Sequence, residues 1–449
     1  MKKVALTLAS IAAIATFAPE ASALPVFARQ TGMACSACHF QHFPLLNAFG
    51  RSFKANAFTM VGAEPMLEGE GLSIPDRLNF AGLTSAYVGT QSGDARSPSI
   101  GVPASGGELS LFYGGKVSDN AGFLSELGAI GGATTNAAKL VTLYPVGDMR
   151  AGFAVYSTGQ GAGYGLEYLN TGAVDAHKMM GNVGPSNQHG NAAYAARYMG
   201  AIVSATGASA IVDGSWGMAS VGAYAAAGPG TNSASTQDLT LTYGRLVGTF
   251  DLAGWDSAVG VQSFGGTACS AGTAAVTQNL LSNPAVIGVA AVAGACTDYA
   301  LNIVDAQMQG EIAGMSTGFY AEYGSAPAGK NGNTNAFAAG GSNLVSGTGV
   351  NISATTLNLS TTVEVVKGAT LQLAGRFANL SAANGSATTT IGADNALMIG
   401  ATYQLAQNIN LGANYTMQSG SALDAARAAN NGTDAVGKTA GTVSLYALF

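Results

Sequence analysis

The chain has 449 residues, of which 9% are charged and 63 are glycine, and its formal net charge at pH 7 is -6. This negative net charge excludes the strongly basic surface that is typical of a nucleic-acid-binding protein. Soluble globular proteins carry about a quarter charged residues, yet no later stretch holds the roughly 18 uninterrupted apolar residues of a membrane helix. The composition therefore favours a transmembrane β-barrel, whose strands alternate lipid-facing and lumen-facing side chains. A secreted Gly/Ala-rich β-solenoid or adhesin is the alternative.

The first residues have the pattern of a secretory signal peptide. Lys2 and Lys3 precede an apolar run over 4–17, and small residues follow at 21–23, as in a cleavable signal. The apolar run is shorter than the roughly 20 residues of a transmembrane helix, which makes a membrane anchor the weaker interpretation. We expect residues 1–23 to be removed on export from the cytoplasm.

Residues 35–39 form a C-x-x-C-H motif. This spacing lets the thiols of Cys35 and Cys38 form thioether bonds to one haem, while His39 becomes an axial ligand of the iron. The two cysteines could instead form a redox disulfide or part of a zinc site, but a zinc site lacks a second closely spaced Cys/His pair. The motif predicts one covalently attached haem c, with His39 as the proximal ligand.

Residues 24–75 are predicted to form a small helical segment around this haem. Pro44 can occupy the first turn of a helix, where its missing N–H is harmless. Leu46, Phe49 and Phe53 then recur at helical spacing on one face. We expect this apolar stripe to pack against the haem or against the wall of the barrel.

The second axial ligand is assigned to Met60, which lies far enough beyond the helix to return to the opposite face of the haem. A Met ligand would raise the reduction potential relative to two His ligands, and an open iron position would indicate a haem enzyme. The residues considered instead for the distal, second-sphere or packing positions are Met33, His42, Met66, His177 and His189.

Three basic residues are candidates for the haem propionates. Arg51 and Lys54 lie on the predicted helix, and Arg29 lies close to the motif. For Arg51 and Lys54, a solvated basic helix face is the equally simple alternative.

Residues 76–449 are predicted to form an all-β, antiparallel transmembrane barrel of about 16 strands, with 14 or 18 as alternatives, because bacterial barrels take even numbers. Short connections at 367–368 and 406–407 alternate with long links at 170–191, 269–296 and 328–350, as in outer-membrane barrels. Strands are expected at 78–87, 109–113, 123–127, 149–157, 238–250, 255–264, 306–315, 317–324, 354–366, 369–380, 395–405, 408–417 and 441–449.

Two further signals lie in this region. Val443, Leu445 and Phe449 share one face of the last expected strand, and a terminal Phe resembles the signal read by bacterial barrel-assembly machinery. Cys269 and Cys296 remain as a pair and are expected to close an external loop by a disulfide in an oxidising compartment; two unpaired thiols are the alternative.

The N-terminal runs resemble those of a known family. These runs are Leu-Pro-Val-Phe-Ala-Arg-Gln-Thr-Gly at 24–32, the motif at 35–39, and Phe-Pro-Leu-Leu-Asn-Ala-Phe-Gly-Arg-Ser-Phe-Lys at 43–54. They are similar to the fused cytochrome–porin family of outer-membrane iron oxidases. The resemblance implies a monohaem plug in a porin-like barrel, which takes electrons from extracellular Fe(II) and passes them to a periplasmic cytochrome or other carrier.

We therefore expect a protein of the bacterial outer membrane, in contact with its lipid, that moves electrons by one haem and most simply oxidises extracellular Fe(II). Outward electron transfer, a diffusion porin with a haem-bearing plug, and a haem enzyme are the alternatives. Asp175, His177 and His189 could attract Fe(II), although their position in an expected loop favours solvated side chains. The Gly-rich runs lack the strand–loop–helix context of a nucleotide site.

Overall fold

The computed structural model describes most of the chain beyond the predicted signal peptide. The described residues are 25–60, 65–76, 78–92, 97–130, 133–134, 136–171, 174–177, 192–227, 238–269, 296–339, 351–382, 392–424 and 438–449. No helix in these ranges has both the length and the apolar character needed to cross a membrane.

Sixteen long strands form one closed ring, and every neighbouring pair in it is antiparallel. An alternating ring of this kind closes only with an even number of strands, which agrees with the predicted number of about 16. In ring order the strands are β3 (Phe80–Gln91), β5 (Gly106–Ser118), β6 (Ala121–Ile130), β8 (Ala137–Val146), β9 (Met149–Thr158), β10 (Ala205–Gly214), β11 (Gly217–Ala225), β12 (Leu241–Leu252), β13 (Trp255–Cys269), β15 (Leu301–Ile312), β16 (Met315–Ala326), β18 (Ile352–Val366), β19 (Ala369–Ala382), β20 (Gly392–Ala406), β21 (Ile409–Ser419) and β22 (Thr439–Leu448), with β22 paired to β3.

Smaller elements lie at the rim, in the lumen and outside the ring. The short strands are β4 (Ser99–Pro103), β7 (Ala133–Thr134), β14 (Cys296–Asp298) and β17 (Thr334–Asn335), and a separate hairpin is formed by β1 (Met66–Gly69) and β2 (Leu72–Pro75). The helices are α2 (Pro25–Thr31), η1 (Cys35–Ala37), α3 (Ala48–Ala55), η2 (Ala162–Gly165), α5 (Ala195–Tyr198) and α6 (Ala336–Ala339).

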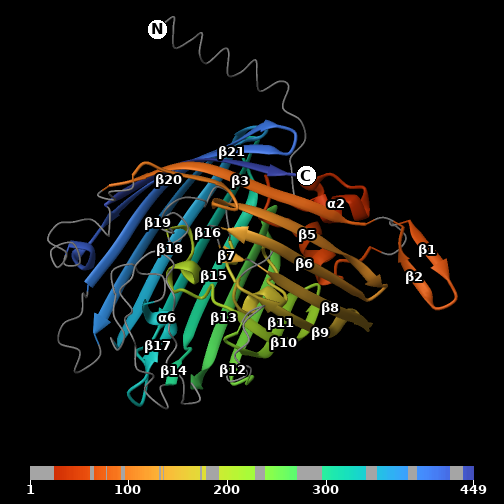
Figure 1. The fold of residues 1–449 in the computed structure, drawn as a ribbon, viewed down its shortest axis with the longest axis horizontal. Helices are drawn as coiled ribbons and strands as arrows, with labels where there is room; N and C mark the ends of the chain where they lie inside the picture. Colours follow the sequence, from red (N-terminus) through yellow and green to blue (C-terminus); the bar gives the residue numbers. More distant parts are fainter. Residues whose placement is uncertain are drawn as a thin grey trace, which may run out of the picture.

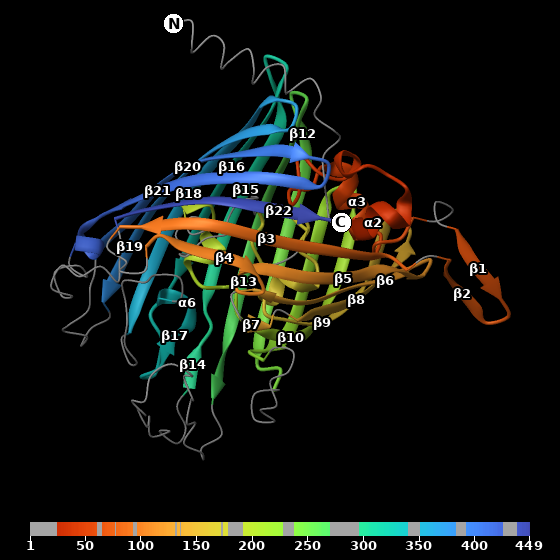
Figure 2. The same cartoon turned by 45° about the horizontal axis from the view of Figure 1, so that its top comes forward.

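The two ends of the barrel differ, as predicted. At one end, here called the turn end, seven two-residue turns join neighbouring strands, and helices α2 and α3 lie there beside the C-terminus (Figures 1 and 2). At 253–254 and 313–314 both turn residues have positive φ, the geometry that matches the twist of a tight hairpin. The opposite end carries the longer connections. In outer-membrane barrels the short turns face the periplasm.

The side-chain pattern is inverted relative to a soluble protein. Large apolar residues such as Val443 and Leu445 are half-exposed on the outer face. The lumenal face instead buries charged residues, namely Glu126, Lys139, Asp213, Arg245, Asp305, Glu322, Arg376 and Asp394. The exposed aromatic residues Tyr144, Trp216 and Phe250 lie close to the tight turns. An apolar belt with aromatic residues at its edge is what the lipid bilayer requires of a barrel.

The predicted strands are recovered best in the C-terminal half. The turn predicted at 367–368 is confirmed. The turn predicted at 406–407 instead falls at 407–408, where Asn408 has a φ of 64°. The strand expected at 306–315 is wrong, because the turn at 313–314 divides it. Strands β8, β10 and β11 were not predicted. In β10 and β11 the many Gly, Ala and Ser residues give only weak alternation of apolar and polar side chains.

The N-terminal segment, residues 25–60, packs inside the turn end. Helix α2 places Val26 against Leu83, Leu124 and Leu448 of the barrel. Side chains of the segment also reach strands far away in sequence: Gln41 Nε2 donates to the Ser316 carbonyl at 2.7 Å, His42 Nε2 lies 3.3 Å from Thr402 Oγ1, and Arg51 pairs with Asp256 at 2.6 Å. The hairpin β1–β2, which we had placed in the haem-bearing segment, instead projects away from the barrel (Figure 1).

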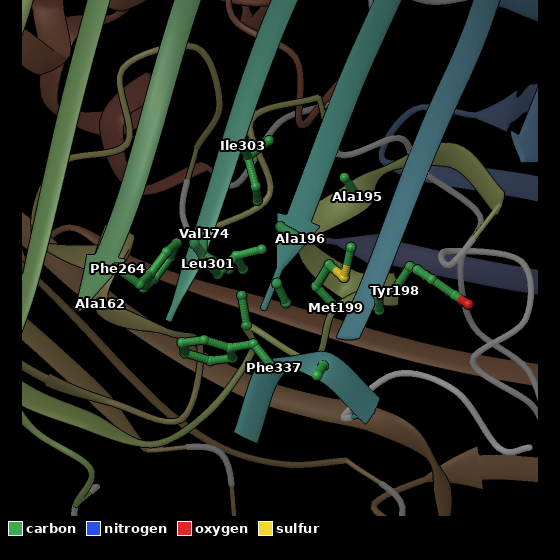
Figure 3. Close-up of a cluster of buried hydrophobic side chains, with 14 of the residues drawn as sticks. Ala162, Val174, Ala195, Ala196, Tyr198, Met199, Phe264, Leu301, Ile303 and Phe337 are labelled. Atoms are coloured by element: carbon green, nitrogen blue, oxygen red, sulfur yellow. The ribbon is translucent and has the colours of Figure 1, made fainter. Parts of the chain in front are cut away.

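Residues 159–204 connect β9 to β10; we call them the inner loop. Its described parts, 159–171, 174–177 and 192–204, fold back into the lumen and are mostly buried. Figure 3 shows Val174, Ala195, Ala196 and Met199 of this loop in one apolar cluster with Leu301, Ile303 and Phe337. Leu45 of the N-terminal segment forms a β-bridge with Asn170 of the inner loop. The two segments therefore meet inside the barrel.

The predicted disulfide between Cys269 and Cys296 is confirmed. The two residues are directly opposite each other at the paired ends of β13 and β14. The bond therefore closes the connection 270–295, which lies outside the described residues.

Candidate functional site

The C-x-x-C-H motif forms one tight turn. Helix η1 begins at Cys35, and the carbonyl of Cys35 accepts hydrogen bonds from the backbone N–H of Cys38 at 3.1 Å and of His39 at 3.0 Å. This turn brings Cys35, Cys38 and His39 to the wall of a single pocket. The structure records no disulfide at either cysteine, and burial raises the pKa of the Cys38 thiol.

The tautomer of His39 follows from one hydrogen bond. Its Nδ1 lies 2.9 Å from the carbonyl oxygen of Leu45, and a carbonyl can only accept. Nδ1 therefore carries the hydrogen, and Nε2 keeps the lone pair that binds a metal. Burial lowers the pKa of His39 to about 4, so the imidazole is neutral at physiological pH. A carbonyl on the far nitrogen is also the usual way in which proteins orient a metal-binding histidine.

Asn47, which our sequence reasoning did not single out, fixes the motif turn to helix α3. Its Oδ1 accepts from the Gly50 N–H at 2.9 Å and so caps the helix, while its Nδ2 donates to the Ala37 carbonyl at 3.0 Å. The helix therefore starts after Asn47 and not at Pro44 as predicted. An Asn just before an apolar helical run is the sequence signal that could have identified this cap.

Gly50 lets α3 approach the motif turn closely. A Cβ at Gly50 would lie 2.0 Å from the carbonyl oxygen of Cys38. We expect Gly50→Ala to destabilise the docked segment by about 1–3 kcal/mol, the usual cost of overpacking, and to speed its cleavage in limited proteolysis. Ser52→Ala on the exposed side of the same helix is the control. Equal protection of both variants would contradict this packing.

The pocket around the motif is a partly open cavity with a mostly apolar wall. Both ends of the N-terminal segment contribute to it, together with β6 and the inner loop. The lining residues besides the motif are Val26, Phe27, Ala28, Thr31, Met33, Ala34, Phe43, Leu46, Gly50, Phe53, Lys54, Phe58, Leu124 and Thr171. Three of the aromatic residues also pack on one another, with centroid distances of 5.3 Å for Phe27–Phe53 and 5.0 Å for Phe27–Phe58.

The three basic candidates occupy different surroundings. Lys54 lines the pocket, but its Nζ donates to the backbone carbonyls of Glu167 and Asn170. Arg51 is buried in its ion pair with Asp256. Arg29 is exposed and donates to the Phe80 carbonyl. Of the three, Lys54 alone is placed at the pocket wall.

The methionine candidates are also separated. Met33 lines the pocket, whereas Met60 packs at the edge of the cluster formed by Phe53, Phe58 and the neighbouring barrel residues. Met66 belongs to the outer hairpin. Phe49 is 41% exposed, so the predicted apolar stripe holds for Leu46 and Phe53 only.

The interpretation of 170–191 as a solvated loop is wrong for its described part. Asp175 and His177 are fully buried in the lumen, because the inner loop folds inward against β15 and β16. His189 lies outside the described residues. Within the described ranges, no three His, Cys, Asp or Glu side chains form a group that could hold a metal ion on their own.

The pocket fits the chemistry of a covalently attached haem. Two thiols and an imidazole whose Nδ1 is hydrogen-bonded line the same cavity, and its wall is apolar and aromatic. No other pair of cysteines with an adjacent histidine occurs in the sequence.

Comparison with known proteins gives structural matches alone: no family model and no curated protein matches the chain. It is similar to OmpT of Vibrio cholerae (10% identity, 86% of this chain and 100% of that chain, TM-score 0.46), to OprB of Pseudomonas putida (10%, 83% and 94%, 0.49) and to the outer-membrane channel DcaP of Acinetobacter baumannii (11%, 83% and 97%, 0.45). The closed ring, the outward apolar face and the alternation of tight turns with long loops define this chain as a β-barrel of the bacterial outer membrane.

Proposed function

We propose that this outer-membrane barrel carries one haem c, bound covalently through Cys35 and Cys38 with His39 as its proximal ligand, and that it transfers electrons across the outer membrane. The observation that carries the proposal is the convergence of both thiols and the oriented imidazole on one apolar pocket. When bound, haem c supplies a centre that accepts and releases one electron at a time. Met60 remains the predicted distal ligand, although it packs against the cluster of Phe53 and Phe58 and is not among the residues that line the pocket.

The chain's own residues hold, orient and shield this site. The Leu45 carbonyl fixes the ring of His39, and Asn47 ties the motif turn to α3. Phe27, Phe53 and Phe58 pack on one another in the wall of the pocket and would present an apolar surface to the haem. Lys54 is the basic residue positioned to meet a propionate at the pocket wall.

The direction that we propose runs from extracellular Fe(II) to a periplasmic cytochrome or other carrier. The pocket lies at the turn end, which faces the periplasm in outer-membrane barrels. A soluble carrier could therefore reach it, whereas an extracellular donor approaches from the loop end. Outward transfer would use the same residues, so the direction must be measured.

The deciding experiment adds Fe(II) anaerobically to intact cells that display the protein and follows the absorption of the haem. Prompt reduction without damage to the outer membrane supports inward transfer. Reduction by dithionite but not by Fe(II) would leave the attached haem in place and contradict the donor.

A diffusion porin is the second candidate, because barrels of this size class can enclose an aqueous channel. Here the N-terminal segment and the inner loop occupy the lumen, and Lys54 bonds one to the other. We therefore expect the purified full chain to show little conductance in planar bilayers. A stable open-channel current under native conditions would favour the porin over the electron conduit.

A further inference from the structure

A group of polar residues meets in the lumen where the inner loop crosses β15 and β16. Asp305 and Glu322 are directly opposite each other on these strands, and Gln307 faces Tyr320 at the next inward pair. His177 of the inner loop packs against this face. The centroid of the His177 ring is 5.2 Å from that of Tyr320, and His177 Nε2 is 3.6 Å from Asp305 Oδ1. All five side chains are almost completely buried.

Several polar atoms of this group have no hydrogen-bond partner among the described residues. They are both ring nitrogens of His177, the side-chain oxygen and nitrogen of Gln307, and Oε1 of Glu322. Buried polar atoms in proteins are normally satisfied by protein groups, ordered water or a bound ion. These atoms belong to side chains of the inner loop and of the facing strands β15 and β16, and an ion or water held between them would give several of them a partner.

The charges around the group point to a cation. Arg245 is shared by Asp305 and Glu167, and Arg197 pairs with Asp175. Glu322 accepts one hydrogen bond, from the Ala195 N–H at 2.6 Å, and forms no ion pair within the described residues. Like charges on directly opposite strand positions repel each other, and an unpaired buried carboxylate is costly.

We propose that the side chains of His177, Glu322 and Gln307 bind one divalent transition-metal cation inside the barrel, with water completing its coordination. Imidazole nitrogen together with carboxylate and amide oxygen suits Fe(II), Mn(II), Co(II) or Zn(II), whereas all-oxygen sites suit Mg(II) and Ca(II). The site does not require haem; that its natural cation is Fe(II) rests on the proposed function.

A path of polar contacts connects this group with the pocket of the motif. Asp305 bonds Arg245, Arg245 bonds the side chain of Glu167, and the Glu167 carbonyl accepts from Lys54 at the pocket wall. A cation at His177 would therefore lie inside the barrel and would be linked to the pocket wall through these contacts.

The test titrates Co(II), a cation with similar ligand preferences that is stable in air, into the purified untagged chain by calorimetry. We expect one Co(II) to bind per chain. Glu322→Gln keeps the shape but removes the charge, and it should weaken binding by at least about tenfold. His177→Ala should weaken it as much. The matched control is Glu311→Gln, which removes an exposed carboxylate from the neighbouring strand β15 and should leave the affinity unchanged.

Thermal unfolding gives an independent readout. A cation that binds only the folded state raises the midpoint, so Co(II) should stabilise the unaltered chain and Glu311→Gln but not Glu322→Gln. Absence of saturable Co(II) binding, or equal loss in both Glu variants, would overturn the site. If His177→Ala fails to fold, Glu322→Gln decides. Haem staining of the same samples separates this outcome from failure of the proposed function.

Discussion

Replacing both Cys35 and Cys38 by Ala is expected to abolish the covalent attachment of haem and, with it, all reduction of the protein by Fe(II). Both thiols line the pocket, and thioether bonds require both sulfur atoms. The measurement is haem-dependent peroxidase staining after denaturing electrophoresis, combined with the visible spectrum of the folded protein. The expected effect is complete loss of the stained band.

The control is the double replacement of Cys269 and Cys296, which removes the same number of sulfur atoms. This disulfide closes the connection between β13 and β14 and has no place in the pocket, so staining should persist. Staining retained without Cys35 and Cys38, or lost without Cys269 and Cys296, would refute the assignment of the motif.

Replacing Arg245 by Met should cost about 3–5 kcal/mol in the free energy of unfolding, because it leaves two buried carboxylates without their cation. The guanidinium is fully buried and lies 2.5 Å from Asp305 and 3.2 Å from Glu167. We expect the altered chain to unfold at lower denaturant concentration, measured by circular dichroism and by its electrophoretic mobility with and without heating.

Lys438→Met is the matched control, since Lys438 forms an exposed ion pair with Asp424 at 2.9 Å. Exposed pairs contribute at most about 1 kcal/mol, so this variant should unfold close to the unaltered chain. Similar losses in both variants would show that the buried ion network is not a main support of the lumen.

The barrel could be predicted because its physical causes are local. Alternation of apolar and polar side chains identified most strands from β12 onward, and two-residue turns with Gly follow from the twist of antiparallel strands. Strands β10 and β11 are rich in Gly and Ala. These small side chains differ little in hydrophobicity between lipid-facing and lumen-facing positions, so the sequence shows little apolar–polar alternation there. The break inside 306–315 was missed because apolar residues continue through the turn.

The candidate site could be predicted in part for the same reason. The spacing of Cys35, Cys38 and His39 is a local signal, and the three residues do face one pocket. The partners of Arg51 and Lys54 could not be anticipated, because Asp256 and Glu167 are more than a hundred positions away. The same holds for His177, whose burial depends on a loop that folds inward.

The position of the two tryptophans has a spectroscopic consequence. Trp216 lies in a tight turn, and Trp255 starts β13 and stacks on Phe319 at a centroid distance of 5.9 Å. The sequence contains no other Trp. All indole fluorescence therefore reports on one membrane interface, so quenchers attached at different depths of the lipid chains can follow the arrival of the turn end during insertion without any added label.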